Sequence, residues 1–164
     1  MISAIVAIDN NWGIGFNGDL LEHIPDDLKH FKALTSGYVV VMGRKTWDSL
    51  PKKPLPNRFN VVITSQERHF EEMTAFIPFT EAVSRLKHSP KEDEWFIIGG
   101  GQIYKELLLL CDRVYITKIF KDHSNVDTYF PNLDEMDDWA PAACSSIHNY
   151  KDLTYQFWQY DRIN

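Results

Sequence analysis

The sequence predicts a single α/β domain over residues 1–164, with a mainly parallel central sheet of about eight strands, about four flanking helices and an antiparallel C-terminal edge strand. Short apolar runs alternate with helical segments as far as residue 120, which is the pattern of parallel strands joined by crossover helices. Of the 164 residues, 44% are hydrophobic and 24% are charged, which suits one globular domain with a sizeable core.

In the first half of the chain we expect strands over residues 2–8, 38–42 and 60–64 and helices over residues 25–35 and 44–50. Each of these strands is a near-continuous apolar run, typical of strands that are buried on both faces. Pro25 suits the first turn of its helix, because the N–H that proline lacks would have no partner there. A loop over 9–24 precedes that helix, and three prolines within 51–57 exclude regular structure in that segment.

In the second half we expect strands over residues 76–77, 95–98, 113–120 and 153–160 and helices over residues 80–86 and 102–110. Thr80 is the expected N-cap of its helix. Residues 121–152 are polar and include an acidic cluster, which predicts a solvated surface loop. The last strand has no helix before it, so we expect it to pair antiparallel with 113–120 at an edge of the sheet.

Charge and cysteine content restrict the class of protein. A net charge of −6 argues against a nucleic-acid or membrane-surface partner. Cys111 and Cys144 provide no disulfide framework, which indicates a reducing compartment. The apolar stretch 2–8 is too short to span a membrane and has no basic region before it. We therefore expect a cytoplasmic protein.

Asp27 is the first candidate functional residue. At about 100° per residue it falls on the apolar face of its helix, whereas its neighbour Asp26 falls on the other side. That face also carries the apolar side chains of Ile24, Phe31 and Leu34. A carboxylate aimed into a core is costly unless something binds it. The alternative is that both acids only stabilise the first turn of the helix through its dipole.

Three glycines, Gly99, Gly100 and Gly101, stand between an expected strand and an expected helix. Glycines let a ligand approach the backbone, and the helix start offers free N–H groups, so we expect a phosphate group to bind here. Tyr104 stands where the dinucleotide-binding fingerprint has a third glycine, and no P-loop lysine follows. The alternative is a simple tight turn.

A second strand–helix junction is basic. Gly43, Arg44, Lys45 and Thr46 begin a segment, residues 44–58, with a local net charge of +4. Two phosphate-type sites at the ends of parallel strands indicate an extended ligand such as a dinucleotide, although a solvated lysine-rich loop is the alternative.

An arginine held behind prolines, Arg58 after Leu55-Pro56-Asn57, suits a bidentate grip on a carboxylate, although a plain surface arginine is the alternative. The histidines have no metal-ligand spacing and no serine lies in a nucleophile elbow, so we expect no metal and no covalent catalysis.

Seven motifs, in order along nearly the whole chain, resemble those of one family. They are Ile14-Gly15, Ile24-Pro25-x-Asp27-Leu28-x-x-Phe31, Met42-Gly43-Arg44-Lys45-Thr46-Trp47, Leu55-Pro56-Asn57-Arg58, Ile98-Gly99-Gly100-Gly101-x-Ile103-Tyr104, Tyr115-x-Thr117 and Asp127-Thr128-x-Phe130-Pro131. With these motifs the chain resembles dihydrofolate reductase of the bacterial type.

The resemblance implies NADPH-dependent reduction of 7,8-dihydrofolate to 5,6,7,8-tetrahydrofolate. Hydride would pass from nicotinamide C4 to pterin C6, with protonation at N5. The catalytic residues implied are Asp27, which would bind the pterin, Thr117, which would hydrogen-bond Asp27, and Leu20 in the lid loop. The resemblance also implies tetrahydrofolate biosynthesis in one-carbon metabolism, antifolate inhibitors and a monomer.

The resemblance assigns two sets of binding residues. The substrate set is Ile5, Asp27, Leu28, Phe31, Leu50, Lys53, Leu55, Arg58, Ile98 and Thr117. The NADPH set is Ala7, Ile14, Gly15, Asn17, Gly18, Asp19, Leu20, Gly43, Arg44, Lys45, Thr46, Thr64, Ser65, Gln66, Ile98, Gly99, Gly100, Gly101, Gln102, Ile103 and Tyr104. The family also carries a cis peptide between two paired glycines, which correspond here to Gly99 and Gly100.

The sequence departs from the family pattern at three places. Leu21-Glu22 stands where the family usually has Pro-Trp. Glu22 either faces inward, where it would titrate together with Asp27, or faces solvent, which the cost of burying a charge favours. One extra residue near Pro51 leaves open whether Lys52 or Lys53 assists Arg58. Gln102 stands where a basic residue is common, so a phosphate contact is weaker.

Two other functions remain open at this point. A reductase of the same fold that acts on a pyrimidine of riboflavin synthesis would keep a nucleotide site but would not need Asp27, Phe31 and Arg58 together. A non-catalytic protein that binds a nucleotide or folate would bind NADPH without turnover.

Overall fold

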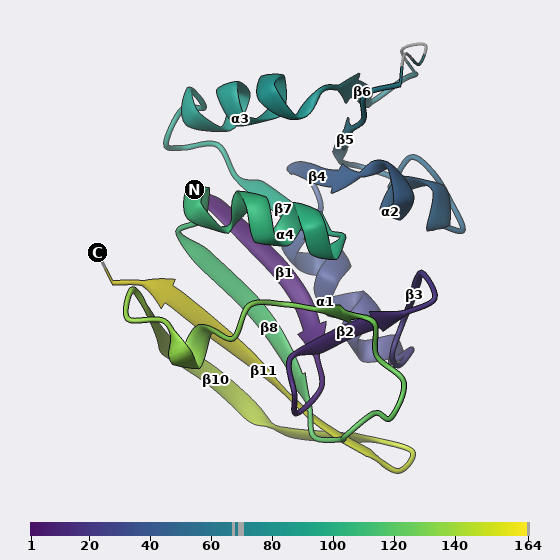
Figure 1. The fold of residues 1–164 in the computed structure, drawn as a ribbon, viewed down its shortest axis with the longest axis vertical. Helices are drawn as coiled ribbons and strands as arrows, with labels where there is room; N and C mark the ends of the chain where they lie inside the picture. The colour runs from purple at the N-terminus through teal and green to yellow at the C-terminus, as the bar shows by residue number, and fades with distance from the viewer. Residues whose placement is uncertain (67, 69–70, 164) are drawn as a thin grey trace.

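The computed structural model describes residues 1–66, 68 and 71–163, and it is organised around one eight-stranded sheet (Figure 1). In spatial order the strands are β10 (Trp139–Tyr150), β11 (Leu153–Arg162), β8 (Arg113–Ile119), β1 (Ile2–Ile8), β7 (Trp95–Gly99), β4 (Val39–Gly43), β5 (Phe59–Ile63) and β6 (Thr74–Ile77). The six strands from β8 to β6 are parallel, whereas β11 and β10 each run antiparallel to their inner neighbour. The α/β class, the parallel centre and the strand count are as the sequence predicts.

Helices cover both faces of the sheet. They are α1 (Pro25–Thr35), α2 (Arg44–Ser49), α3 (Phe79–Lys87) and α4 (Gly101–Leu107), with short 3-10 turns η1 (Leu108–Leu110) and η2 (Leu133–Glu135). The largest core cluster joins α3 and α4 to one face, and α1 and α2 pack on the other face (Figure 1). None of the helices in the described part of the chain is long and apolar enough to cross a membrane.

A second, three-stranded sheet forms beside the ends of the parallel strands. Its order is β3 (Asp19–Leu20), β2 (Gly13–Phe16) and β9 (Thr128–Tyr129), all antiparallel. The sequence predicts an irregular loop over 9–24, so β2 and β3 are additions to that prediction. Both are short, and one side of β2 depends on a partner strand more than 100 residues later in the chain.

The order and type of the other elements confirm the predictions up to residue 120, with small differences at the ends. The expected helix over 102–110 begins at Gly101 and finishes as the 3-10 turn η1. Thr80 as N-cap was wrong, because Pro78 takes that position and no side chain caps the helix start.

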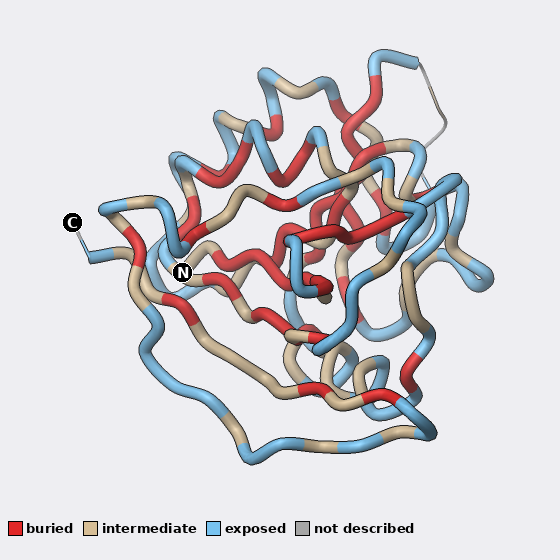
Figure 2. Tube along the Cα trace, turned by 60° about the horizontal axis from the view of Figure 1, so that its bottom comes forward, coloured by how far each residue is buried: buried red, intermediate tan, exposed pale blue. Residues whose placement is uncertain are grey.

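The prediction of a solvated loop over 121–152 was wrong. This segment contains β9, η2 and the twelve-residue strand β10, which takes the edge outside β11. The predicted antiparallel pairing of the last strand with β8 is confirmed. Figure 2 shows exposed residues along β10 and buried ones along the central strands. Because β10 is an edge strand with two register shifts, it accommodates Pro141 and a polar composition.

Leu133 provides a test of this correction, because it is fully buried in the core cluster although it lies within the segment expected to be solvated. We expect Leu133→Ala to lower the free energy of unfolding by about 2–5 kcal/mol, since it leaves a cavity in a packed core. The matched control Leu109→Ala, at a leucine that is 82% exposed, should change it by less than about 0.5 kcal/mol. Urea denaturation measures both, and equal effects would contradict the assigned burial.

Candidate functional site

The side chains of Asp27 and Thr117 meet between α1 and β8. The Thr117 hydroxyl donates to a carboxyl oxygen of Asp27 at 2.5 Å, which joins residues 90 positions apart. Burial raises the pKa of Asp27, and the bond from Thr117 opposes that rise only in part. The neighbouring Asp26 is exposed and accepts a bond from Tyr155 at 3.2 Å. The two acids therefore have the different environments that the helical face argument predicts.

The apolar side chains of the expected substrate set come from several elements. Ile5 is buried on β1, and Leu28 on α1 is 54% exposed although it stands next to Asp27. Phe31, Leu50, Leu55 and Ile98 are all partly buried. An exposed leucine beside a buried acid presents apolar surface to a ligand rather than to the core.

Arg58 is fixed in place rather than mobile on the surface. It is only 4% exposed, its Nε donates to the carbonyl oxygen of Pro56 at 2.9 Å, and its Nη1 donates to the hydroxyl of Thr35 at 3.1 Å. The guanidinium also lies 5.6 Å from the ring centroid of Phe31. Its Nη2 bonds to no side chain or carbonyl in the described part of the chain, so that group is left to pair with an incoming anion.

Lys53 has a contact that the sequence did not indicate. Its Nζ donates to the carbonyl oxygens of Trp47 and Asp48, each at 3.3 Å, at the C-terminal end of α2. A lysine in that place satisfies carbonyls left open by the helix end. Lys52 is exposed. Whether either lysine assists Arg58 stays a prediction.

The two glycine junctions lie side by side at the ends of neighbouring strands. Met42 on β4 pairs with Gly99 on β7, and a Cβ on Gly43 would lie 3.0 Å from the side chain of Ile103. A Cβ on Gly100 would lie 3.4 Å from the hydroxyl of Thr46. The peptide between Gly99 and Gly100 is cis, as the resemblance implies.

Both helices that follow these junctions start without a side-chain cap, so their first N–H groups are left for a ligand. Arg44 donates to Asp48 at 2.9 Å, and Arg68 reaches the same carboxylate at 3.5 Å. Lys45 and Ser65 are exposed. Arg68 lies in no sequence motif, so the sequence does not indicate it as part of this cationic group. Together these groups form a cationic border that fits an anionic, phosphate-bearing ligand.

The small sheet carries the expected lid residues, and Asp127 holds them in place. Its carboxylate accepts from the backbone N–H of Asn17 at 3.0 Å, and its own N–H donates to the carbonyl oxygen of Gly15 at 3.0 Å. The bond from Asn17 holds the pKa of Asp127 below its ordinary value. A Cβ on Gly101 would lie 2.5 Å from Thr128, so β9 packs directly on the second glycine junction.

The remaining expected cofactor residues have varied environments. Ala7 is partly buried, Ile14, Gly15, Ile103 and Thr64 are buried, and Asn17, Gly18, Asp19, Leu20, Gln66 and Gln102 are exposed. The hydroxyl of Tyr104 is used within the fold, because it donates to the carbonyl oxygen of Ile5 at 2.6 Å. Burial raises the pKa of that hydroxyl well above its ordinary range.

Glu22 is neither paired with Asp27 nor directed freely to solvent. Its carboxylate bonds to Nε2 of His123 at 3.0 Å and to Nζ of Lys121 at 3.1 Å. Burial favours its neutral form, but these two bonds outweigh burial and hold the pKa of Glu22 below its ordinary value. The sequence leaves an inward and an outward position open for Glu22, and no motif indicates His123 or Lys121 as its partner.

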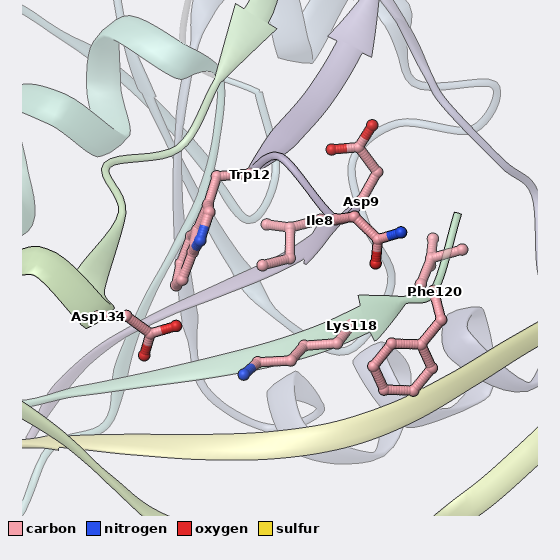
Figure 3. Close-up of a pocket in the computed structure, with 8 residues that line it drawn as sticks. Ile8, Asp9, Trp12, Lys118, Phe120 and Asp134 are labelled. Carbon is pink, nitrogen blue, oxygen red and sulfur yellow. The ribbon is translucent and has the colours of Figure 1, made fainter. Parts of the chain in front are cut away.

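A separate pocket of about 200 Å³ lies where β1 and β8 end, and its lining includes Asp9, Lys118 and Ile119 (Figure 3). Neither Asp27 nor Thr117 belongs to this lining. Within the described ranges no three His, Cys, Asp or Glu side chains gather into a group that could hold a metal ion.

A parallel sheet with two adjoining glycine junctions, a cationic border and a partly buried acid bonded to a threonine has the form of an enzyme that binds a nucleotide cofactor at its strand ends. Comparison with known sequences gives the family. The family model described as dihydrofolate reductase matches residues 1–162. The chain therefore belongs to the dihydrofolate reductase family.

Individual relatives agree with this assignment. The chain is 39% identical to the dihydrofolate reductase of Bacillus subtilis over 169 aligned residues, which cover 100% of this chain and 96% of that protein. It is 39% identical over 142 residues to the dihydrofolate reductase of Staphylococcus aureus, covering 87% of this chain and 84% of that one. A Buchnera aphidicola dihydrofolate reductase is 37% identical over 158 residues, covering 95% of this chain and 94% of that one.

The raised pKa of Asp27 has a consequence for stability. A carboxyl group whose pKa is higher in the folded state stabilises the fold only at low pH, and that contribution is lost as the pH rises through the folded-state pKa. At neutral pH the ionised Asp27 therefore costs stability. We expect Asp27→Asn, which can still accept from Thr117, to unfold at higher urea concentration than the wild type at pH 7.5.

The difference should shrink as the pH falls from 7.5 toward 4, because the carboxyl group of the folded wild type regains its proton when the pH falls through its raised pKa. Urea denaturation curves of both proteins across this pH range measure it. A stability difference that does not depend on pH would contradict the raised pKa.

Proposed function

We propose that this protein catalyses the reduction of 7,8-dihydrofolate to 5,6,7,8-tetrahydrofolate with NADPH. The single observation that carries the proposal is the partly buried Asp27–Thr117 pair in the same sheet that carries the two glycine junctions. Family membership and relatives with this printed name support the reaction. The reaction places the protein in tetrahydrofolate biosynthesis and one-carbon metabolism.

Asp27 is the proposed group that binds the pterin and assists its protonation. The pterin presents a 2-amino group and N3 on one edge, and a carboxylate accepts hydrogen bonds from both. A raised pKa suits a proton-linked step near neutrality, because an acid works best when its pKa lies near the operating pH. Thr117 donates to Asp27 and fixes the orientation of the carboxyl group, which leaves the remaining lone pairs for the ligand.

The rest of the substrate has complementary partners among the other expected substrate residues. Leu28, Phe31, Leu50 and Leu55 offer apolar surface for the flat pterin and aminobenzoyl rings. Arg58, held by Thr35 and Pro56, has the fixed guanidinium that a bidentate bond to the glutamate α-carboxylate requires.

The residues present fit NADPH. The uncapped starts of α2 and α4 and the glycines between them give phosphates access to backbone N–H groups. Arg44, Lys45 and Ser65 are proposed to contact the 2′-phosphate, and Thr46, Thr64 and Gln66 to line the same cofactor. When bound, NADPH supplies the hydride that reaches C6 of the pterin. Leu20 and the other lid residues of 14–20 exclude water from the reacting atoms.

We also propose that the protein works as a monomer in the cytoplasm and that antifolates occupy the Asp27 site. The location follows from the two cysteines, which lack a disulfide framework. An inhibitor whose protonated ring resembles the pterin edge would pair with Asp27 in the same way as the substrate.

The proposed role of Asp27 is tested by turnover. We expect Asp27→Asn to lower kcat/KM for dihydrofolate at neutral pH by about 10²–10⁴-fold, the usual contribution of a positioned acid, and by less as the pH falls and solvent supplies the proton. The control Asp26→Asn, at the exposed neighbour, should stay within about twofold, because an amide still accepts from Tyr155. NADPH oxidation followed by absorbance measures both variants.

Each outcome separates the functions considered above. If kcat/KM is unchanged in Asp27→Asn, the protein is still a dihydrofolate reductase, but another group assists the protonation. Binding of NADPH without turnover of dihydrofolate would favour a binding protein or the reductase that acts on a pyrimidine.

The proposed phosphate contact is tested at Arg44. Because only NADPH carries a 2′-phosphate, Arg44→Ala should raise KM for NADPH by about 10–100-fold, which is what the loss of one charge-assisted contact costs. The same variant should change KM for NADH by less than about threefold, since the rest of the site is intact. Steady-state kinetics with each cofactor provides the comparison. Equal effects on KM for NADPH and KM for NADH would contradict the assignment of Arg44 to the 2′-phosphate site.

A further inference from the structure

A histidine lies between two carboxylates at the base of the lid. Nδ1 of His123 lies 3.1 Å from a carboxylate oxygen of Asp9, and its Nε2 lies 3.0 Å from a carboxylate oxygen of Glu22. Asp9 ends β1, Glu22 lies between β3 and α1, and His123 belongs to the connection from β8 to β9. The three side chains therefore link both ends of the segment 9–22 to a third part of the chain.

Asp9 is buried and has little besides His123 to balance its charge. It is 2% exposed, and its other oxygen accepts from the backbone N–H groups of Asn11 and Gly13 at 2.9 and 2.8 Å. The oxygen that faces the ring also accepts from the backbone N–H of His123 at 3.3 Å. Figure 3 shows its carboxylate turned away from Lys118 and Asp134. Lys118 bonds instead to Tyr160 at 2.8 Å. A buried carboxylate is stable only when it is paired and hydrogen-bonded, and His123 is the ionisable side chain that reaches it.

The chemistry of the two contacts requires a protonated ring. A neutral imidazole has one N–H donor and one acceptor nitrogen, whereas an ionised carboxylate only accepts. Both ring nitrogens of His123 face carboxylate oxygens, so only the imidazolium satisfies both contacts. The other charged groups nearby are Lys121, which also bonds to Glu22, and Asp122, which accepts from Asn11 at 3.3 Å.

The linkage is closely packed at the start of the lid. A Cβ on Gly13 would lie 2.9 Å from a carboxylate oxygen of Asp9 and 2.8 Å from Val126. Gly13 begins β2, which pairs with β9, and β9 packs on Gly101 at the proposed cofactor site. Asp9 is thus connected to the lid and to β9 through closely packed backbone.

We propose that His123, as an imidazolium, is a positioning residue that holds the lid in place over the cofactor by binding Asp9 and Glu22 together. The proposal rests on the proposed function, because it assigns the lid its role in NADPH binding. Loss of the second ring proton breaks one of the two ring bonds and weakens the hold on one end of the lid, which then depends on Lys121 at Glu22 and on backbone N–H groups at Asp9. Binding NADPH must then order the lid again, so affinity falls while the chemical step inside the closed complex is unchanged.

Two variants separate this role from a merely structural one. In His123→Gln the single amide group cannot meet carboxylates on opposite sides, so one end of the lid is released at every pH. In Glu22→Gln the amide accepts from a protonated ring or donates to a neutral one, so the linkage survives in both states. The control is His88→Gln on α3, where the ring contacts only a carbonyl oxygen of its own helix.

The first measurement is the dissociation constant for NADPH from intrinsic fluorescence, between pH 6 and pH 9. We expect about tenfold weaker binding at pH 9 than at pH 6 in the wild type and the control, weak binding throughout in His123→Gln, and nearly constant, tight binding in Glu22→Gln. kcat should differ between these proteins by less than about twofold at any one pH. Equal pH dependence in all four proteins would overturn the proposal.

The second measurement does not depend on reductase activity. Amide hydrogen exchange of residues 10–20 in the ligand-free protein, corrected for the intrinsic effect of pH, should follow the same pattern. Exchange should rise with pH in the wild type, be fast in His123→Gln and stay slow in Glu22→Gln. If these differences in exchange appear but dihydrofolate is not reduced, the proposed function is refuted and the role of His123 in positioning the lid is supported. If the enzyme is active and exchange does not change, the role of His123 is refuted.

Discussion

The bond between Thr117 and Asp27 is the contact on which the proposed site depends. It holds α1 against β8 and keeps an acid where water is largely excluded, which raises the pKa of Asp27. The parallel order of the sheet makes this contact possible, because the carboxyl ends of β8, β1, β7 and β4 lie along one edge. The lid, the glycine junctions and the cationic border all gather at that edge, so a single geometric constraint assembles the site.

The central elements could be predicted from the sequence because each carries its signal locally. Strands such as β1 and β4 are nearly continuous apolar runs, and such runs indicate strands buried on both faces. Asp27 could be separated from Asp26 because a helix repeats every 3.6 residues and only one of two neighbours can face the sheet. The adjacency of Gly43 and Gly99 follows from parallel pairing, which brings equivalent strand ends together.

Elements that depend on distant partners could not be predicted in this way. β10 is built from small and polar residues and contains Pro141, and only its position outside β11 makes it a strand. β2 needs β9, and the linkage of Asp9, Glu22 and His123 joins three segments with no shared spacing. Pro78 displaced Thr80 from the helix start because a helix boundary depends on the backbone that enters it.

The contrast between the two acids at this edge explains why the departure at Glu22 is compatible with the proposed chemistry. Glu22 and Asp27 are five positions apart, yet the bonds from His123 and Lys121 lower the pKa of Glu22, whereas burial raises the pKa of Asp27 and the bond from Thr117 opposes that rise only in part. Two acids in such different environments do not compete for one proton. The pKa of Asp27 is therefore raised by the burial of Asp27 itself, and the partners of Glu22 keep the charge of that second carboxylate engaged elsewhere. Asp27 is thereby left as the single proposed catalytic acid at this edge of the sheet.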